Sequence, residues 1–170
     1  SLRPIVEAHR TIGYTVLGSA TAWRIANQLR YDLGIEARAT DAWLASSGVG
    51  KTFLDEKTLL VVDEAGQLSS RQMHAVLSEV ARAGAKLVLV GDRRQLQPIG
   101  AGGALSIVAR ATDFARVDKI VRQKDEWARQ ATMALAAGRT HEALTAYGER
   151  GHVHLHSGQK AAVRAMVEQR

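Results

Sequence analysis

The sequence lacks cysteine and long apolar runs, and each absence excludes a class of protein. With no cysteine among 170 residues, the chain forms neither disulfide bonds nor thiolate metal sites. No apolar run reaches the ~18 residues that a membrane-spanning helix needs, and no signal peptide opens the chain. Because a chain without cysteine suits a reducing compartment, we expect a cytoplasmic protein with no membrane partner.

The composition is that of a globular domain with a basic charge. A hydrophobic content of 46% and a charged content of 24% are ordinary for a globular protein, and the length suits about one domain with its own core. Lysine and arginine number 23 against 17 acidic residues, which gives a net charge of +6. This balance favours an anionic partner such as nucleic acid, although a well-solvated basic surface explains it equally well.

Two short apolar runs indicate buried strands, TLLVVDEAG at 58–66 and AKLVLVGDRRQLQPIG at 85–100. Such runs are typical of a parallel sheet covered by helices on both faces. Between them, Ser69 and Gln72 form a capping box and Gly84 is a C-terminal stop, so the unit is a right-handed strand–helix–strand crossover. The predicted apolar stripe of this helix consists of Met73, Val76, Leu77, Val80 and Ala81.

The other elements follow the same α/β pattern. The sequence predicts helices over 2–11, 21–34, 40–46 and 103–111, and three more helical stretches within 125–170. It predicts further strands over 14–18, 114–120 and 152–156, and a loop over 46–57.

The stretch SSGVGKT at 46–52 ends in Gly-Lys-Thr, as a phosphate-binding P-loop does. A P-loop joins a strand to a helix, and the return to a parallel strand needs a dozen or more residues. Only residues 53–57 separate Thr52 from the strand at 58, and Ala45 stands where the motif has its first glycine. We interpret the stretch as a surface loop, and keep an independent small NTPase using residues 45–52 as an alternative.

Carboxylates follow the first buried strand at the edge where ligands bind in open α/β sheets. Asp63 could hold Mg²⁺ through water, and Glu64 could orient and deprotonate an attacking water. A solvated strand end is the competing interpretation. The polar stretch 91–97 ends the neighbouring strand and would point into the same crevice.

Histidines and tryptophans offer two further candidates. His152, His154 and His156 lie on one face of the predicted strand, where they could share a metal or simply face solvent. Trp23 and Trp43 could stack on bases. Trp127 shares a predicted helix with Ala131 and Ala134 and is expected to pack.

Four stretches carry a family resemblance. VVDEAGQLSSRQMHAVL resembles motif II of superfamily 1 helicases, and LVLVGDRRQLQPIGAGGAL resembles motif III of their RecD-like branch. KIVRQ at 119–123 is similar to the next motif, and GYTVLGSATAWRIANQL is similar to motif Ia. Within that branch, the chain resembles in particular the helicase segment of TraA-type conjugative-transfer relaxases.

The resemblance implies a P-loop NTPase (RecA-like) parallel sheet with flanking helices. It places the first strand and the Walker A loop upstream of Ser1, so the isolated chain is expected not to hydrolyse ATP. Residues 1–120 would be part of the first motor domain, and 121–170 the start of the second motor domain or connecting helices. The parent would be an ATP- and Mg²⁺-dependent DNA helicase that unwinds plasmid DNA during transfer. Its partners would be single-stranded DNA and the remaining motor and relaxase domains.

The resemblance also assigns roles to residues. Asp63 and Glu64 would be the Mg²⁺ and catalytic carboxylates, Gln95 the γ-phosphate sensor, and Arg122 the arginine supplied across the domain cleft. Single-stranded DNA would meet Ser19, Thr21, Trp23 and Thr40. The chain departs from the family at 21–24, where relatives often carry Gly-Lys, and at Ala42. A non-catalytic nucleic-acid-binding module is the remaining alternative.

Overall fold

The computed structural model describes residues 2–48, 54–92, 103–115, 117 and 124–168. The chain divides into two compact units, Ser1–Phe114 and Ala115–Arg170. None of the helices in these described ranges is long and apolar enough to cross a membrane.

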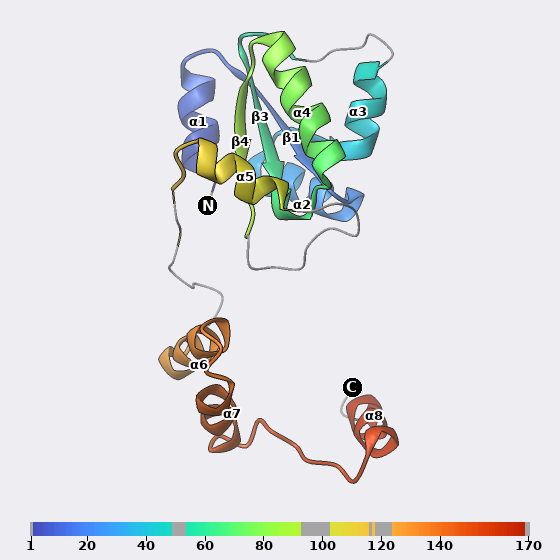
Figure 1. The fold of residues 1–170 in the computed structure, drawn as a ribbon, viewed down its shortest axis with the longest axis vertical. Coiled ribbons are helices and arrows are strands. Elements are labelled where there is room, and N and C mark those ends of the chain that lie inside the picture. The colour runs from blue at the N-terminus through green and yellow to red at the C-terminus, as the bar shows by residue number, and fades with distance from the viewer. Residues whose placement is uncertain (1, 49–53, 93–102, 116, 118–123, 169–170) are drawn as a thin grey trace. The chain divides into compact units, whose positions relative to one another are not determined.

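Unit 1 is built on a parallel sheet of four strands (Figure 1). The strands are β1 (Thr15–Ala20), β2 (Glu36–Ala39), β3 (Thr58–Asp63) and β4 (Lys86–Leu89), in the order β2-β1-β3-β4. All three neighbouring pairs are parallel. The central strand β3 is buried from Thr58 to Val62, as its uninterrupted apolar run predicts.

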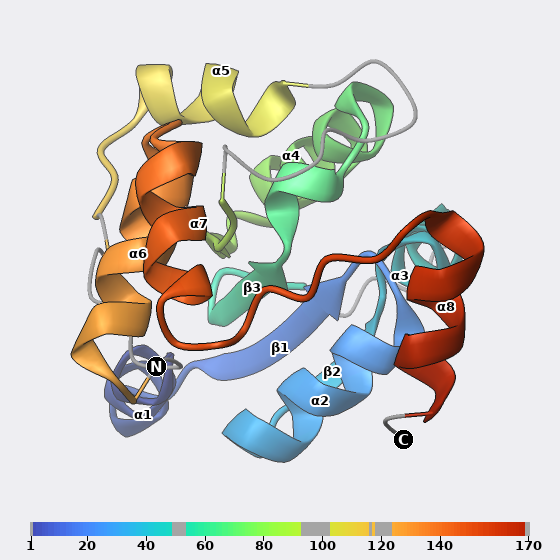
Figure 2. The ribbon, with the colours of Figure 1, turned by 90° about the horizontal axis from the view of Figure 1, so that it is seen from below.

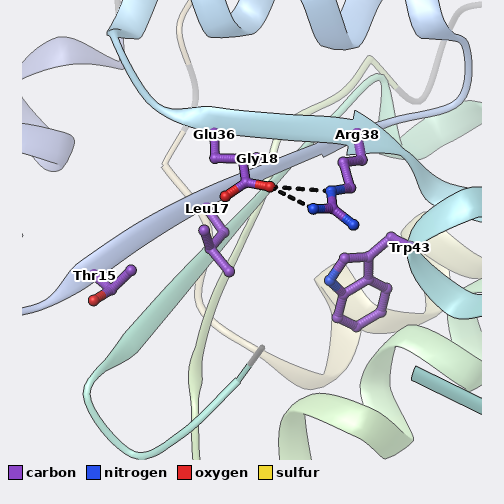
Figure 3. Close-up of a pocket in the computed structure, with 6 residues that line it drawn as sticks. All are labelled: Thr15, Leu17, Gly18, Glu36, Arg38 and Trp43. Carbon is purple, nitrogen blue, oxygen red and sulfur yellow. Dashed lines mark hydrogen bonds and ion pairs between the residues drawn. The ribbon is translucent and has the colours of Figure 1, made fainter. Parts of the chain in front are cut away.

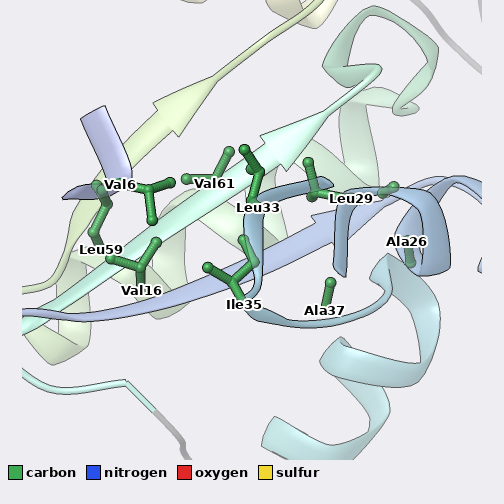
Figure 4. Close-up of a cluster of buried hydrophobic side chains, with 10 residues drawn as sticks. Val6, Val16, Ala26, Leu29, Leu33, Ile35, Ala37, Leu59 and Val61 are labelled. Atoms are coloured by element: carbon green, nitrogen blue, oxygen red, sulfur yellow. The ribbon is translucent and has the colours of Figure 1, made fainter. Parts of the chain in front are cut away.

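Helices cover both faces of this sheet. On one face, α1 (Arg3–Thr11) and α2 (Trp23–Leu33) pack on a core to which β3 contributes Leu59 and Val61 (Figure 4). Figure 2 shows α2 alongside β1 and β2. On the other face, α3 (Thr40–Gly48), α4 (Ser70–Ala83) and α5 (Ala104–Ala111) share a second core with Leu60 and Val62. Successive β3 side chains therefore serve opposite cores, and the predicted α/β class is confirmed.

Helix α4 begins and ends where the sequence predicts. The Ser69 hydroxyl accepts from the Gln72 N–H, the Gln72 side chain accepts in return from the Ser69 N–H, and Gly84 ends the helix with φ 65°. Met73, Val76 and Val80 are buried and Leu77 is half-buried, but Ala81 is exposed. The predicted stripe is wrong at Ala81, because one further residue turns the side chain by about 100° away from the core.

Strand β2 was not expected from the sequence. Its residues are Glu-Ala-Arg-Ala, and only Ala37 and Ala39 are buried. Two alanines give a weak period-two signal, so the strand depends on its pairing with β1. Helix α3 follows at once and extends to Gly48, two residues beyond the expected end.

Unit 2 contains α6 (Glu126–Ala136), α7 (Thr140–Gly148) and α8 (Gln159–Glu168). Gly138, with φ 77°, turns the chain between α6 and α7, and Ala131, Ala134 and Ala143 form their small core. Trp127 packs as predicted: its ring lies 5.3 Å from the Tyr147 ring, edge to face. The Arg129 guanidinium, which hydrogen-bonds to Glu126, lowers the pKa of that carboxyl.

One predicted strand is not found among the described residues, and another falls mostly outside them. Residues 152–156 form no strand, because in the described part of unit 2 no other segment pairs with them, and Leu155 is 92% exposed. The strand predicted over 114–120 falls largely on residues outside the described ranges, and residues 114, 115 and 117 are not in a strand. The predicted division at residue 120 stays a prediction; the boundary between the compact units lies at 114/115.

Candidate functional site at the carboxyl edge of the sheet

Parallel strands bring their carboxyl ends to one edge of the sheet, and the polar residues singled out in the sequence gather there. Thr21 follows β1, Thr40 follows β2, and Glu64 follows β3. In the register, Ala20 of β1 lies opposite both Ala39 of β2 and Asp63 of β3. This carboxyl edge therefore collects the expected nucleotide carboxylates and the expected DNA-facing segments.

Ser19 and Thr40 form a buried pair at this edge. Their hydroxyl oxygens lie 2.8 Å apart, and the Thr40 hydroxyl donates to the Ala20 carbonyl at 3.0 Å. Both residues are fully buried. The pair ties the end of β1 to the start of α3, and because both residues are 0% exposed, neither presents an atom to DNA in this structure.

The two carboxylates stand on a strained turn. Asp63 ends β3 half-buried, and its Oδ1 accepts from the Glu64 N–H at 2.9 Å. Among the described residues, Glu64 is the one non-glycine with positive φ, at 52°. Such a backbone costs about 1–3 kcal/mol and is concentrated at functional sites. Both side chains are half-exposed and accessible to a ligand.

Two glycines allow the turn after β3 to pack closely against the turn after β4. A Cβ on Gly91 would lie 2.8 Å from the Gly66 nitrogen, and one on Gly66 would lie 3.0 Å from the Asp92 carbonyl oxygen. The Ala65 N–H also donates to the Val90 carbonyl at 2.8 Å. Because these contacts are backbone on backbone, they fix the carboxylate turn beside the stretch that begins the motif III resemblance.

Further hydrogen bonds cross the edge between segments distant in sequence. The Thr21 hydroxyl donates to Gln67 Oε1 at 3.3 Å, at the end of a short 3₁₀ turn, η1 (Ala65–Gln67). Gln72 Nε2 donates to Asp41 Oδ1 at 2.7 Å. Sequence reasoning found Gln72 as a capping residue but missed Asp41 and Gln67, since nothing local in the sequence announces these contacts.

The tryptophans are placed differently. Trp23, in the first turn of α2, is 52% exposed, and Arg24 beside it is also exposed. The N-cap of α2 is Ala22, which makes no side-chain capping bond. Trp43 is only 4% exposed and belongs to the core, so it offers no face to a base.

A hollow of about 190 Å³ lies elsewhere, on the face of the sheet (Figure 3). The ion pair of Arg38 with Glu36, at 2.7 Å, lies at its side, together with the Trp43 ring. Thr15, at the start of β1, also lines it. Neither Asp63 nor Glu64 does, so the hollow is separate from the carboxylate turn.

Several predicted site residues lie outside the described ranges. These are Gln95, Arg122 and the Lys51-Thr52 pair. The segment before that pair is described: α3 runs through Ala45 to Gly48. A helix, rather than the strand that a P-loop needs, leads into SSGVGKT, and this argues against an independent NTPase site there.

The carboxylate of Asp63 could serve Mg²⁺. Mg²⁺ usually takes one or two carboxylates and completes its shell with waters and phosphate oxygens, and Asp63 supplies one carboxylate while Glu64 stays available for a different role. The described residues include no group of three or more histidines and carboxylates able to hold a metal. The metal interpretation of His152, His154 and His156 is therefore not supported.

A parallel sheet covered on both faces, with carboxylates after the inner strand β3, is an α/β architecture that P-loop NTPases share. The chain belongs to the AAA domain family, whose model matches residues 1–158, and this match gives the P-loop NTPase class.

Individual relatives narrow the comparison. The chain is 43% identical over 141 residues to "Conjugal transfer protein TraA" of Rhizobium radiobacter, which covers 83% of this chain and 13% of that protein. It is 41% identical over 145 residues to "Probable conjugal transfer protein TraA" of Sinorhizobium fredii (strain NBRC 101917 / NGR234), 85% of this chain and 13% of that protein. It is 33% identical over 92 residues to "ATP-dependent RecD2 DNA helicase" of Deinococcus radiodurans, 54% of this chain and 12% of that protein. The resemblance to RecD-like helicases and to TraA is confirmed.

Proposed function

We propose that this chain is part of an ATP-dependent DNA helicase or translocase that acts in conjugative DNA transfer. The carboxylate turn at Asp63 and Glu64, strained and set beside the segments after β1 and β4, is the observation that carries the proposal. The similarity to TraA and to RecD2 supports it. The chain spans 13% of the length of the TraA relatives, so the activity is that of a larger protein.

The two carboxylates divide the work at the nucleotide. Asp63 Oδ1 is occupied by the Glu64 N–H, so its other oxygen would hold Mg²⁺ through water. Bound Mg²⁺ would offset the negative charge of the phosphates. Glu64 would orient the attacking water and accept its proton. Gln95 would sense the γ-phosphate, and Arg122 would reach it from the second motor domain, of which residues 121–170 would be the start.

The phosphate-binding loop would come from another segment of the whole protein. Strand β4 is the outermost strand on its side of the sheet, yet Leu87 and Leu89 pack on one core and Val88 on the other. A strand that is apolar on both faces is typical of a sheet interior. We propose that a further parallel strand pairs with β4 and brings the Walker A loop beside Gly91.

Single-stranded DNA would bind across the ends of β1 and β2. Trp23 would stack on a base, while Arg24 and the uncapped start of α2 would meet phosphates. Trp23→Ala should weaken binding of a labelled single strand by about 1–3 kcal/mol. Trp43→Phe is the matched control, because Trp43 is buried, and it should leave the affinity unchanged.

The test of the proposal is ATP turnover by the full-length protein, with and without single-stranded DNA. We expect DNA-stimulated turnover that Glu64→Gln lowers by about 10³-fold while ATP still binds, because a general base acts on the chemical step alone. A wild-type protein that binds DNA in a salt-dependent way but shows no turnover would contradict the proposal. It would instead favour a non-catalytic nucleic-acid-binding module, which the net charge of +6 also fits.

A further inference from the structure

Two glutamines, Gln67 and Gln72, join the DNA-facing side of the carboxyl edge to the segment that follows the carboxylates. Gln67 accepts from Thr21, 46 residues away in sequence, and Gln72 donates to Asp41, 31 residues away. Thr21 comes directly after β1, and Asp41 lies in the first turn of α3. The pair, called here the glutamine bridge, therefore connects three separate segments of the edge.

The Gln72 side chain is used at both ends of its amide. Its Oε1 accepts from the Ser69 N–H at 3.0 Å, which completes the capping box of α4. Its Nε2 donates to Asp41 Oδ1 at 2.7 Å. One half of the amide holds the start of α4 and the other half holds the start of α3. Glutamate would serve the cap equally well, but it could not donate to Asp41.

The bridge is connected to Glu64 through a short, packed segment. The Gln67 N–H donates to the Glu64 carbonyl at 2.9 Å, and the Leu68 N–H donates to the Ala65 carbonyl at 3.3 Å. Leu68 is 1% exposed and anchors the segment in the core. A change in the backbone at Glu64 would therefore move both glutamines together.

The opposite end of the bridge is equally constrained. Asp41 is next to Thr40, and Thr21 is next to Ala20, and the hydroxyl of Thr40 donates to the carbonyl of Ala20. The buried pair of Ser19 and Thr40 holds these two segments together. The bridge thus contacts the DNA-facing segments at positions that move as one piece.

We propose that Gln67 and Gln72 are positioning residues that couple the nucleotide site to the single-stranded-DNA site. This inference rests on the proposed function. The carboxylate turn shifts as nucleotide binds, the segment 64–72 carries the shift, and the two side-chain bonds pass it to the ends of β1 and β2. In this proposal neither glutamine contacts nucleotide or DNA, and both act on how strongly the binding of one ligand depends on the other.

The test measures the affinity of the full-length protein for a labelled single strand, with and without a non-hydrolysable ATP analogue and Mg²⁺. A coupled protein changes its DNA affinity by about 5-fold or more between the two conditions. Gln72→Glu keeps the cap but sets a carboxylate against Asp41, and should bring that factor to within about 2-fold of unity. Asp41→Asn with Gln72→Glu reverses donor and acceptor and should restore the coupling.

Gln28→Glu is the matched control. Gln28 Nε2 donates to Asp32 Oδ1 at 2.8 Å within α2, so this variant breaks the same kind of bond and adds the same charge away from the bridge. It should leave the coupling factor unchanged. Gln67→Met removes the bond to Thr21 without adding charge, and it should also lower the coupling factor. This variant keeps the inference testable even where Gln72→Glu does not fold.

The outcomes separate this inference from the proposed function. If the DNA affinity of the wild-type protein changes on addition of nucleotide, and that of Gln72→Glu and of Gln67→Met changes by the same factor, the bridge does not couple the sites. Loss of coupling in Gln28→Glu would also contradict the inference, because the effect would then follow from added charge. If the DNA affinity of the wild-type protein is the same with and without nucleotide, both the coupling role of the bridge and the proposed motor function are contradicted.

Discussion

The two edges of the sheet in unit 1 are built from different kinds of contact. The amino edge combines a local turn with contacts between distant segments. In the turn, Thr58 donates to Asp55 Oδ1 at 2.6 Å, and the Lys57 N–H donates to the same oxygen at 3.0 Å. The ammonium groups of Lys57 and Lys86 lie 5.2 and 4.5 Å from the centre of the Tyr14 ring. This edge closes on itself with unstrained turns and stabilises the fold.

The carboxyl edge also joins segments far apart in sequence, but it contains backbone strain. Ser19 bonds to Thr40, the glutamine bridge crosses to Thr21 and Asp41, and Glu64 has positive φ. Strain of this kind persists only where the surrounding structure over-determines it. The difference indicates that the amino edge serves stability, while the carboxyl edge maintains an arrangement that stability alone would not select.

The largest effect is expected at Glu64, where a single substitution should lower catalysis and raise stability. Glu64→Gly should lower ATP turnover of the full-length protein by about 10³-fold, since the general base is lost. It should also raise the free energy of unfolding by up to about 1 kcal/mol, because relief of about 1–2 kcal/mol of strain exceeds the added entropy of the unfolded chain. Turnover assays and thermal unfolding measure the two quantities. A destabilised variant would show that the turn is not strained.

The packing of the two turns predicts the next effect. Gly91→Ala should lower the free energy of unfolding by about 1–3 kcal/mol, because its Cβ would lie 2.8 Å from the Gly66 nitrogen, which is backbone and cannot swing aside. Gly148→Ala is the control, since nothing lies within 4 Å of a Cβ there. Equal unfolding curves for the two variants would contradict the close contact of the turns.

Buried threonines at opposite edges sharpen the comparison. Thr40→Val and Thr58→Val each remove a buried hydroxyl that hydrogen-bonds, and each should lower the free energy of unfolding by about 1–3 kcal/mol. Only Thr40→Val should also weaken binding of single-stranded DNA, because it loosens the segment that follows β2. Titration of a labelled oligonucleotide at a temperature where both variants are folded distinguishes them. A similar loss of DNA affinity in Thr58→Val would erase the distinction between the edges.

The smallest effect is expected at the amino edge. Lys86→Ala should lower the free energy of unfolding by about 0.5–1 kcal/mol, the typical value of an exposed cation–π contact. DNA affinity and ATP turnover should not change. A marked loss of DNA affinity in this variant would show that nucleic acid binds at the amino edge, which contradicts the account.

The sequence predicted the elements that carry strong local signals. Strand β3 is a continuous apolar run, and α4 has a capping box at one end and a glycine at the other, so each is defined by its own residues. Strand β2 was missed because Glu-Ala-Arg-Ala becomes a strand only beside β1. Residues 152–156 alternate as a strand does, yet alternation without a partner forms no sheet.

The candidate site likewise has one part that the sequence predicts and one part that it does not. The carboxylates of Asp63 and Glu64 follow a strand whose end the sequence marks, so their place at the carboxyl edge was predictable. The burial of Ser19 and Thr40 and the bond between Gln72 and Asp41 depend on how α3 and α4 meet over the sheet. No local pattern encodes that meeting, so these contacts became apparent only in the structure.

The central claim is that nucleotide and DNA act at the carboxyl edge, and amide hydrogen exchange of the full-length protein tests it most directly. Exchange would be compared with and without single-stranded DNA, a non-hydrolysable ATP analogue and Mg²⁺. We predict slower exchange at 63–67 on addition of nucleotide and at 19–24 on addition of DNA, with no change at 55–58 and 84–86. Slower exchange at those amino-edge segments, with the carboxyl edge unchanged, would contradict the account.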